Sequence, residues 1–213
     1  MIPAELTGGW VRNGIAIDGA DPIETTVVWW LQAPSKHCDL RVPQVGTEGV
    51  MSFAGTTTWD DPVLTWHPEI ELDPSIFEDI GVISWDGEDM METGSFAEGG
   101  RDVSYVERWQ RLPGSEGEQW ALSCANGRLV RTGSYALTIV DARPEGGGFA
   151  AVAWTLGGGT DGIAGWAPHH SWPAQATLPP PPITIADGET SVLLADGILW
   201  NIDEHRKAAG ISG

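Results

Sequence analysis

The sequence predicts an all-β protein, and two observations carry that prediction. First, short runs rich in Val, Ile, Thr and Trp recur along the chain, and these residue types suit the pleated surface of a strand. Second, the runs are separated by Asp-Gly or Asn-Gly pairs, which supply the positive φ that tight hairpin turns require. These pairs are Asp18-Gly19, Asp86-Gly87, Asn126-Gly127, Asp161-Gly162, Asp187-Gly188 and Asp196-Gly197.

The first half of the chain contains eight expected strands. Eight antiparallel strands are enough to close a barrel around one small ligand or around packed side chains. We expect them at Gly9–Ile17, Glu24–Leu31, Lys36–Val42, Val50–Thr58, Val63–Leu72, Gly81–Trp85, Asp89–Gly94 and Val103–Arg111.

A polar segment rich in Gly and Pro at 112–118 separates these strands from a second all-β series. We therefore expect an N-terminal barrel over residues 1–114 and a C-terminal barrel over residues 115–213. The C-terminal part contains a proline-rich stretch at 171–182 that favours an extended connection. Its seven expected strands are Trp120–Ala125, Arg128–Thr132, Tyr135–Asp141, Gly148–Leu156, Gly162–Pro168, Ser191–Ala195 and Gly197–Asp203.

Composition restricts the classes of partner. The 213 residues carry a formal net charge of −19, and such an acidic surface repels nucleic-acid phosphates and anionic membranes. The start of the chain lacks the features of a signal peptide, and no apolar run reaches the length of a membrane helix. Two cysteines make no disulfide framework, so we expect a cytoplasmic protein. The 12 tryptophans favour packed cores or aromatic pocket walls.

Several motifs resemble the fungal casein-kinase-interacting protein family and its bacterial relatives. The resemblance spans most of residues 8 to 112 and implies a calycin-like fold of two lipocalin-like barrels packed side by side. The resemblance implies no particular catalytic residue. One difference is His37, where bacterial relatives tend to have an apolar or aromatic residue. The motifs are Gly9-Trp10-Val11-Arg12, Trp30-Leu31-Gln32-Ala33-Pro34-Ser35, Asp39-Leu40-Arg41-Val42-Pro43, Phe53-Ala54-Gly55-Thr56, Trp85-Asp86-Gly87, Met91-Glu92-Thr93-Gly94, Val103-Ser104-Tyr105-Val106-Glu107-Arg108-Trp109-Gln110 and Asp196-Gly197-Ile198-Leu199-Trp200.

The candidate site is centred on three ionisable residues in one expected strand. His37, Asp39 and Arg41 alternate with Cys38 and Leu40, so the three share one face of the strand. A histidine oriented by a carboxylate can transfer protons near neutral pH, and an arginine can hold an anionic group. The structural alternative is an ion pair between Asp39 and Arg41 at the barrel rim.

A second candidate lies on the last strand of the first barrel. Glu107 shares a face with Tyr105 and Trp109. Burial would raise the pKa of this carboxyl unless Arg12 or Arg41 paired with it, and such a pair would tie strands together without any functional role.

We expect the first barrel to bind a small, partly apolar ligand. In this hypothesis Trp10, Trp29, Trp30, Tyr105 and Trp109 form walls, Arg12 and Arg41 anchor polar groups, and His37, Asp39 and Glu107 are the acid–base candidates. One alternative is a cofactor-free isomerase, cyclase or lyase that uses a barrel His or Glu. The other is a protein-interaction module with filled barrels.

No cofactor or metal is expected. The chain lacks the glycine-rich phosphate-binding patterns and the serine-hydrolase elbow. No Cys/His spacing matches a zinc site, and the adjacent His169 and His170 should point to opposite faces of a strand.

Overall fold

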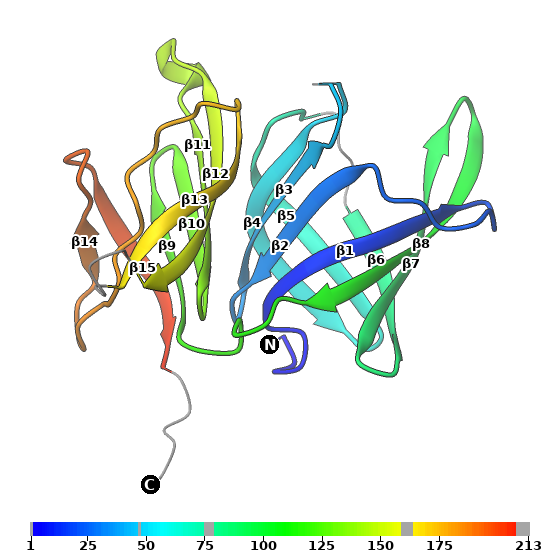
Figure 1. Ribbon diagram of the computed structural model, residues 1–213, viewed down its shortest axis with the longest axis horizontal. Coiled ribbons are helices and arrows are strands. Elements are labelled where there is room, and N and C mark those ends of the chain that lie inside the picture. The colour runs from blue at the N-terminus through cyan, green and yellow to red at the C-terminus, as the bar shows by residue number, and fades with distance from the viewer. Residues whose placement is uncertain (1, 47, 75–78, 159–163, 208–213) are drawn as a thin grey trace, which may run out of the picture.

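A computed structural model describes residues 2–46, 48–74, 79–158 and 164–207, and its first half is a closed barrel of eight antiparallel strands (Figure 1). Each strand pairs with the next along the chain, and the last strand pairs with the first to close the barrel. The strands are β1 (Gly8–Ile17), β2 (Thr26–Gln32), β3 (Lys36–Pro43), β4 (Met51–Asp60), β5 (Val63–Glu71), β6 (Asp79–Asp86), β7 (Asp89–Glu98) and β8 (Arg101–Arg111).

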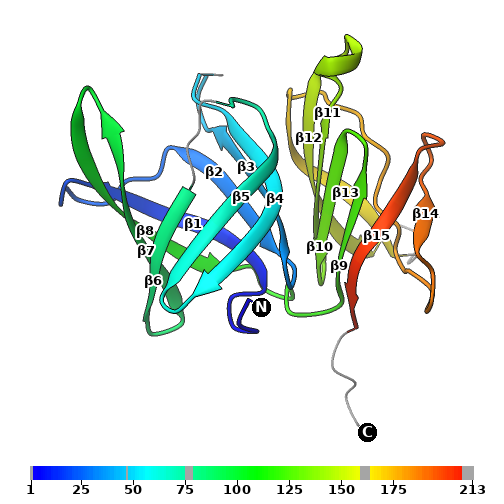
Figure 2. The ribbon, with the colours of Figure 1, turned by 180° about the vertical axis from the view of Figure 1, so that it is seen from behind.

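The second half is a seven-stranded antiparallel sheet beside the barrel, as the view from behind also shows (Figure 2). Its order is β13-β12-β11-β10-β9-β15-β14, and a three-residue 3-10 helix (Arg143–Glu145) connects β11 to β12. The strands are β9 (Gln119–Cys124), β10 (Gly127–Thr132), β11 (Tyr135–Asp141), β12 (Phe149–Gly158), β13 (Ala164–Trp172), β14 (Ser191–Leu193) and β15 (Leu199–Arg206).

The all-β prediction is confirmed, and each expected strand overlaps an observed one, with ends that differ by a few residues. The start of the expected strand Gly162–Pro168 and the expected turn at Asp161-Gly162 lie outside the described residues. The turn chemistry behaves as expected at Asp18-Gly19, where both residues have positive φ, 50° and 76°. Sheet pairing changes from the barrel to the second sheet between Arg111 and Gln119. A division of the chain into two domains at this segment stays a prediction.

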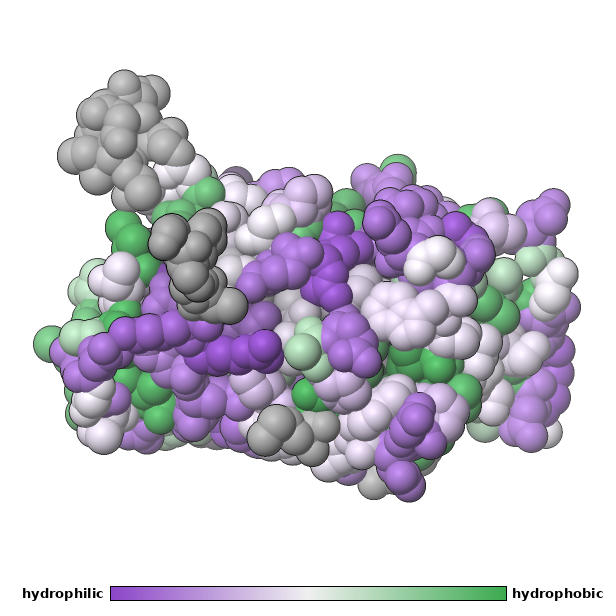
Figure 3. Space-filling view, turned by 90° about the horizontal axis from the view of Figure 1, so that it is seen from below, coloured by the Kyte–Doolittle hydropathy of each residue, from purple (hydrophilic) through white to green (hydrophobic). Residues whose placement is uncertain are grey.

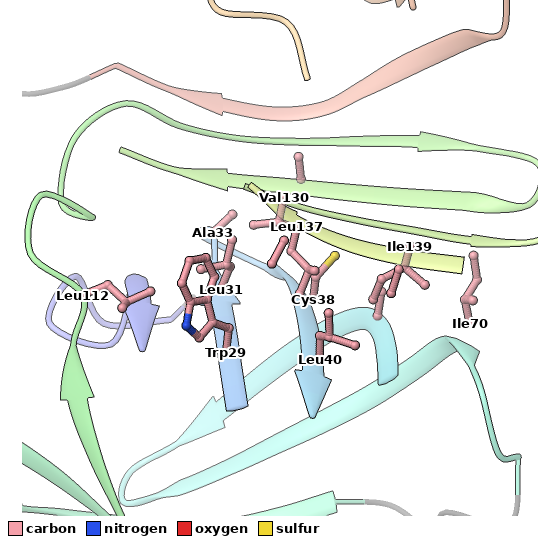
Figure 4. Packing of buried hydrophobic residues seen from close by; sticks show 14 of the residues in the cluster. Trp29, Leu31, Ala33, Cys38, Leu40, Ile70, Leu112, Val130, Leu137 and Ile139 are labelled. Atoms are coloured by element: carbon pink, nitrogen blue, oxygen red, sulfur yellow. The ribbon is translucent and has the colours of Figure 1, made fainter. Parts of the chain in front are cut away.

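The two β units share a core. Residues on the outer face of β2 and β3, among them Leu31, Cys38 and Leu40, pack against Val130 and Leu137 of the second sheet (Figure 4). Polar contacts border this core: the Glu204 carboxylate accepts hydrogen bonds from the backbone N–H and hydroxyl of Ser35. Strands β2 and β3 therefore present apolar side chains to the second sheet and their other side chains to the barrel interior.

The outer surface is mixed in character. Hydrophilic and hydrophobic residues alternate over the face seen from the end where the N-terminus lies (Figure 3). Both cysteines, Cys38 and Cys124, are free thiols. Within the described part of the chain, no helix has the length and apolar character to cross a membrane.

The charged interior of the barrel

The alternation of β3 places the predicted row inside the barrel. His37, Asp39 and Arg41 pair with interior residues of β2 and β4, whereas Cys38 and Leu40 belong to the core shared with the second sheet. His37 is 0% and Asp39 is 1% exposed, so both are fully removed from water. The strand pattern alone therefore identified which side chains enter the barrel.

One end of the interior is filled by aromatic rings. The Trp30 ring lies 5.3 Å from that of Trp66, 5.8 Å from that of Trp109 and 6.3 Å from that of Trp10. Leu6, from the segment before β1, joins the same cluster, and its carbonyl accepts a hydrogen bond from Trp10 Nε1. The indoles at this end pack against one another, and the charged side chains lie toward the other end.

The other end holds seven charged side chains, which we call the lumenal charge cluster. It contains two arginines and five carboxylates, contributed by five strands and by the segment before β2. Its members are Arg12, Glu24, Asp39, Arg41, Asp79, Glu92 and Glu107.

Arg12 is held by two carboxylates. Its Nε lies 2.8 Å from Glu24 Oε2 and its Nη2 lies 3.2 Å from Glu24 Oε1, which makes a two-pronged ion pair. Its Nη1 donates to Glu107 Oε1. A β-bulge between Arg12 and Gly14 shifts the register of β1 against β8. These contacts tie β1, β8 and the segment before β2 together.

Arg41 is the second centre of the cluster. Its Nε donates to Asp39 Oδ1 at 2.9 Å, its Nη2 lies 3.8 Å from Asp79 Oδ2, and its Nη1 lies 4.0 Å from Glu107 Oε1. The guanidinium also lies over the Phe53 ring, 5.5 Å from its centroid. Arg41 is 15% exposed and Asp79 is 23% exposed at the side chain, so water reaches this part of the interior.

Glu92 has neutral donors as its hydrogen-bond partners. Tyr105 Oη donates to Glu92 Oε1 at 3.0 Å, and Trp109 Nε1 donates to Glu92 Oε2 at 3.1 Å. The absence of a side chain at Gly81 makes room for this carboxyl, because a Cβ there would lie 2.6 Å from Glu92 Cγ. Glu92 therefore lies in a fitted position between two aromatic donors.

Burial and mutual repulsion raise the pKa values of three carboxyls of the cluster, Asp39, Asp79 and Glu92. Desolvation raises the pKa of Asp39 to about 6, and the neighbouring Arg41 only partly opposes it. The pKa values of Asp79 and Glu92 are also raised, first by desolvation and then by the other carboxylates nearby. The two arginines therefore do not compensate all of the acidic groups.

His37 lies at the filled end of the barrel, away from the exposed part of the charge cluster. The Thr57 hydroxyl donates to Gln32 Oε1 at 2.8 Å, so its oxygen is free to accept the proton of His37 Nδ1 at 2.9 Å. His37 Nε2 is buried and has no hydrogen-bond partner among the described residues. Desolvation lowers the pKa of His37 to about 3, so the ring is neutral at neutral pH. These contacts give His37 a place in the core.

Trp29 does not line the interior, which corrects its place among the predicted ligand-binding residues. Its neighbour Trp30 points inward, so strand alternation turns Trp29 outward. There it contacts the Tyr135 ring at 5.3 Å and the two rings of His169 and His170. The other predicted wall residues, Trp10, Trp30, Tyr105 and Trp109, lie on interior positions.

Sequence reasoning missed two members of the cluster, Asp79 and Glu24. The expected sixth strand began at Gly81, whereas β6 begins at Asp79, and extending the alternation from Ile83 would have placed Asp79 inside. Glu24 belonged to the expected strand Glu24–Leu31, on the face that it shares with Trp30, but it was not singled out; in the structure it lies before β2, which begins at Thr26. Across the described ranges, no group of three or more His, Cys, Asp or Glu side chains is arranged to hold a metal ion.

The barrel with its charged interior and the adjoining sheet define a two-unit, all-β protein. A family model described as Protein HRI1 matches residues 10–204, so this chain belongs to the HRI1 family, the casein-kinase-interacting family. The resemblance inferred from the motifs is confirmed.

The fold is similar to a solved structure. The crystal structure of the uncharacterized protein YLR301w from Saccharomyces cerevisiae superposes with a TM-score of 0.71 at 16% sequence identity. The alignment covers 93% of this chain and 98% of the yeast chain. A search of curated proteins found no match.

The structural role of His37 predicts a large loss of stability for His37→Ala. The substitution leaves a cavity beside Phe53 and removes the hydrogen bond to Thr57, and we expect the free energy of unfolding to fall by about 3 kcal/mol. Urea denaturation measures this loss, with His67→Ala as the control at a less buried histidine. A loss below about 1 kcal/mol would contradict the core role.

The raised pKa of Asp39 predicts a pH dependence of stability. Between about pH 4 and pH 6 the folded state keeps a proton that the unfolded state has lost, so stability falls as pH rises through this range. Asp39→Asn removes this effect. We expect the difference in unfolding free energy, wild type minus Asp39→Asn, to decrease by about 2 kcal/mol between pH 4 and pH 7.

Denaturation at several pH values measures this difference, and the exposed Asp60→Asn is the control. A difference that stays constant or increases with pH would show that folding does not raise the pKa of Asp39.

Proposed function

We propose that the protein binds a small, partly apolar ligand at the charged end of the barrel interior, and that the polar part of this ligand is cationic or rich in hydrogen-bond donors. The observation that supports this most directly is the surplus of carboxylates over arginines in the lumenal charge cluster. A ligand ammonium group would favour the ionised forms of Asp79 and Glu92, whose pKa values are raised first by desolvation and also by neighbouring carboxylates.

The arginines do not favour an anionic ligand. Arg12 already pairs with Glu24 and Glu107, and Arg41 pairs with Asp39 and lies near Asp79 and Glu107. An incoming carboxylate would have to displace one of these partners and would meet the remaining acidic groups at short range. This reverses the initial expectation that an arginine anchors an anion.

Aromatic rings at the same end support an apolar part of the ligand. The Phe96 ring lies 6.3 Å from the Tyr105 ring and is largely exposed, while Tyr105 is half-buried. Apolar contact surface with a few convergent polar groups is the general form of a ligand site. A catalytic role for His37, Asp39 and Glu107 stays a prediction, and His37 contributes least to it because its described contacts lie at the filled end.

A matched pair of probes tests the proposal. We expect phenethylamine to shift the indole N–H resonance of Trp109 in a saturable way, because that N–H bonds Glu92, and 3-phenylpropanoate to leave it unchanged. Glu92→Gln should weaken phenethylamine binding at least tenfold. Glu98→Gln, at an exposed position of the same strand, is the matched control. Equal binding of both probes, or of neither, contradicts the proposal.

A different observation supports the alternative of a protein-interaction module. Val82 pairs with Thr93, which pairs with Val106, so these side chains form a row on the outer face of β6, β7 and β8 with Ile80 beside it. The three aliphatic side chains are 38–45% exposed and lie on the barrel wall that the second sheet does not cover. Such a row is the type of surface that a partner protein covers.

For this alternative, the family suggests a casein kinase as the partner to test. We expect a purified casein kinase to bind the wild type, and binding to fall at least tenfold in the double variant Val82→Lys/Val106→Lys. Val45→Lys, at a position that is 90% exposed and outside the row, should bind like the wild type. Titration calorimetry measures the three affinities. Undiminished binding by the double variant would rule out this surface.

A further inference from the structure

Strand β13 contains a β-bulge that brings two adjacent histidines together. The pairing with β12 changes register between Ala153 and Trp154, which pair with His170 and Pro168, so His169 has no partner in the ladder. In a regular strand, adjacent side chains point to opposite faces. A bulge bends the strand and redirects one side chain, and here it overturns the expectation that these two histidines diverge.

The two imidazole rings approach each other through their Nδ1 atoms. His169 Nδ1 and His170 Nδ1 are 3.0 Å apart, with ring planes at 82° to one another. With one proton between them, these nitrogens form a hydrogen bond. With both protons on Nε2, both Nδ1 atoms are free to act as ligands, and a metal ion at about 2.0–2.1 Å from each would make an angle close to 90° at the metal.

Aromatic surroundings keep this pair in place. The Trp29 ring lies 4.6 Å from the His169 ring and 4.9 Å from the His170 ring, and Tyr135 packs edge-on against Trp29. The pair therefore lies where the barrel wall meets the second sheet.

We propose that His169 and His170 bind a divalent transition-metal ion through their Nδ1 atoms, at the contact between β13 and Trp29 of β2. A near-right angle between imidazole ligands suits Cu(II) or Ni(II) better than tetrahedral Zn(II). In the described part of the chain, no third His, Cys, Asp or Glu completes the set, so water fills the remaining coordination positions. The site is open and is independent of the ligand proposed for the barrel interior.

Titration of the tag-free protein with CuCl2 and NiCl2 tests the proposal. We expect saturable quenching of tryptophan fluorescence because Trp29 contacts both imidazoles, with Cu(II) binding more tightly than Ni(II), and Ni(II) more tightly than Mg(II). His169→Ala, at an exposed position, should fold normally and weaken Cu(II) binding at least tenfold. His67→Ala is the control for an unrelated histidine.

Three outcomes decide the proposal. An electron paramagnetic resonance spectrum of the 1:1 Cu(II) complex with coupling to two imidazole nitrogens, lost in His169→Ala, supports it. Equal Cu(II) affinity of the wild type and His169→Ala overturns it, as does the absence of saturable binding. Far-UV circular dichroism of each variant shows whether a lost signal reflects lost binding or lost folding.

Discussion

The structure depends on closing eight strands into a barrel whose inward positions include seven charged groups. Once β8 pairs with β1, charged side chains from opposite walls are enclosed together and must neutralise one another. Arg12 and Arg41 do most of this by contacting several carboxylates each. Desolvation, together with the nearby carboxylates, outweighs this compensation and raises the pKa values of Asp39 and Glu92. The polarity that makes this end a candidate site is thus a consequence of barrel closure.

Strands β2 and β3 contribute side chains to two separate cores. Trp30 belongs to the aromatic end of the barrel, whereas Trp29, the preceding residue, belongs to the contact with the second sheet. The same division separates Asp39 from Cys38 and Leu40. Since both faces are buried, a shift of register by one residue would place charges in an apolar interface and aliphatic groups among carboxylates. One register of β2 and β3 therefore places the charged groups inside the barrel and also presents the apolar face to the second sheet.

Much of the candidate site could be predicted because strand periodicity is a local property. The alternation in β3 and β8 identified the faces of Asp39, Arg41, Tyr105 and Glu107 without any tertiary information. The partner of each charge could not be predicted, because Arg12 and Glu107 are 95 residues apart and meet only through closure. Asp79 was missed because the start of a strand has a weak local signal.

By itself, the sequence determined the strands, the turns between them and the inward or outward sense of most side chains, since these follow from local backbone chemistry. Only the tertiary structure decided which face of β2 the second sheet covers, so Trp29 became an interface residue. It also decided that the indoles fill one end of the barrel and that the two histidines of β13 converge at a bulge. These outcomes depend on long-range packing and on a single extra residue in one strand pair, and neither leaves a periodic trace in the sequence.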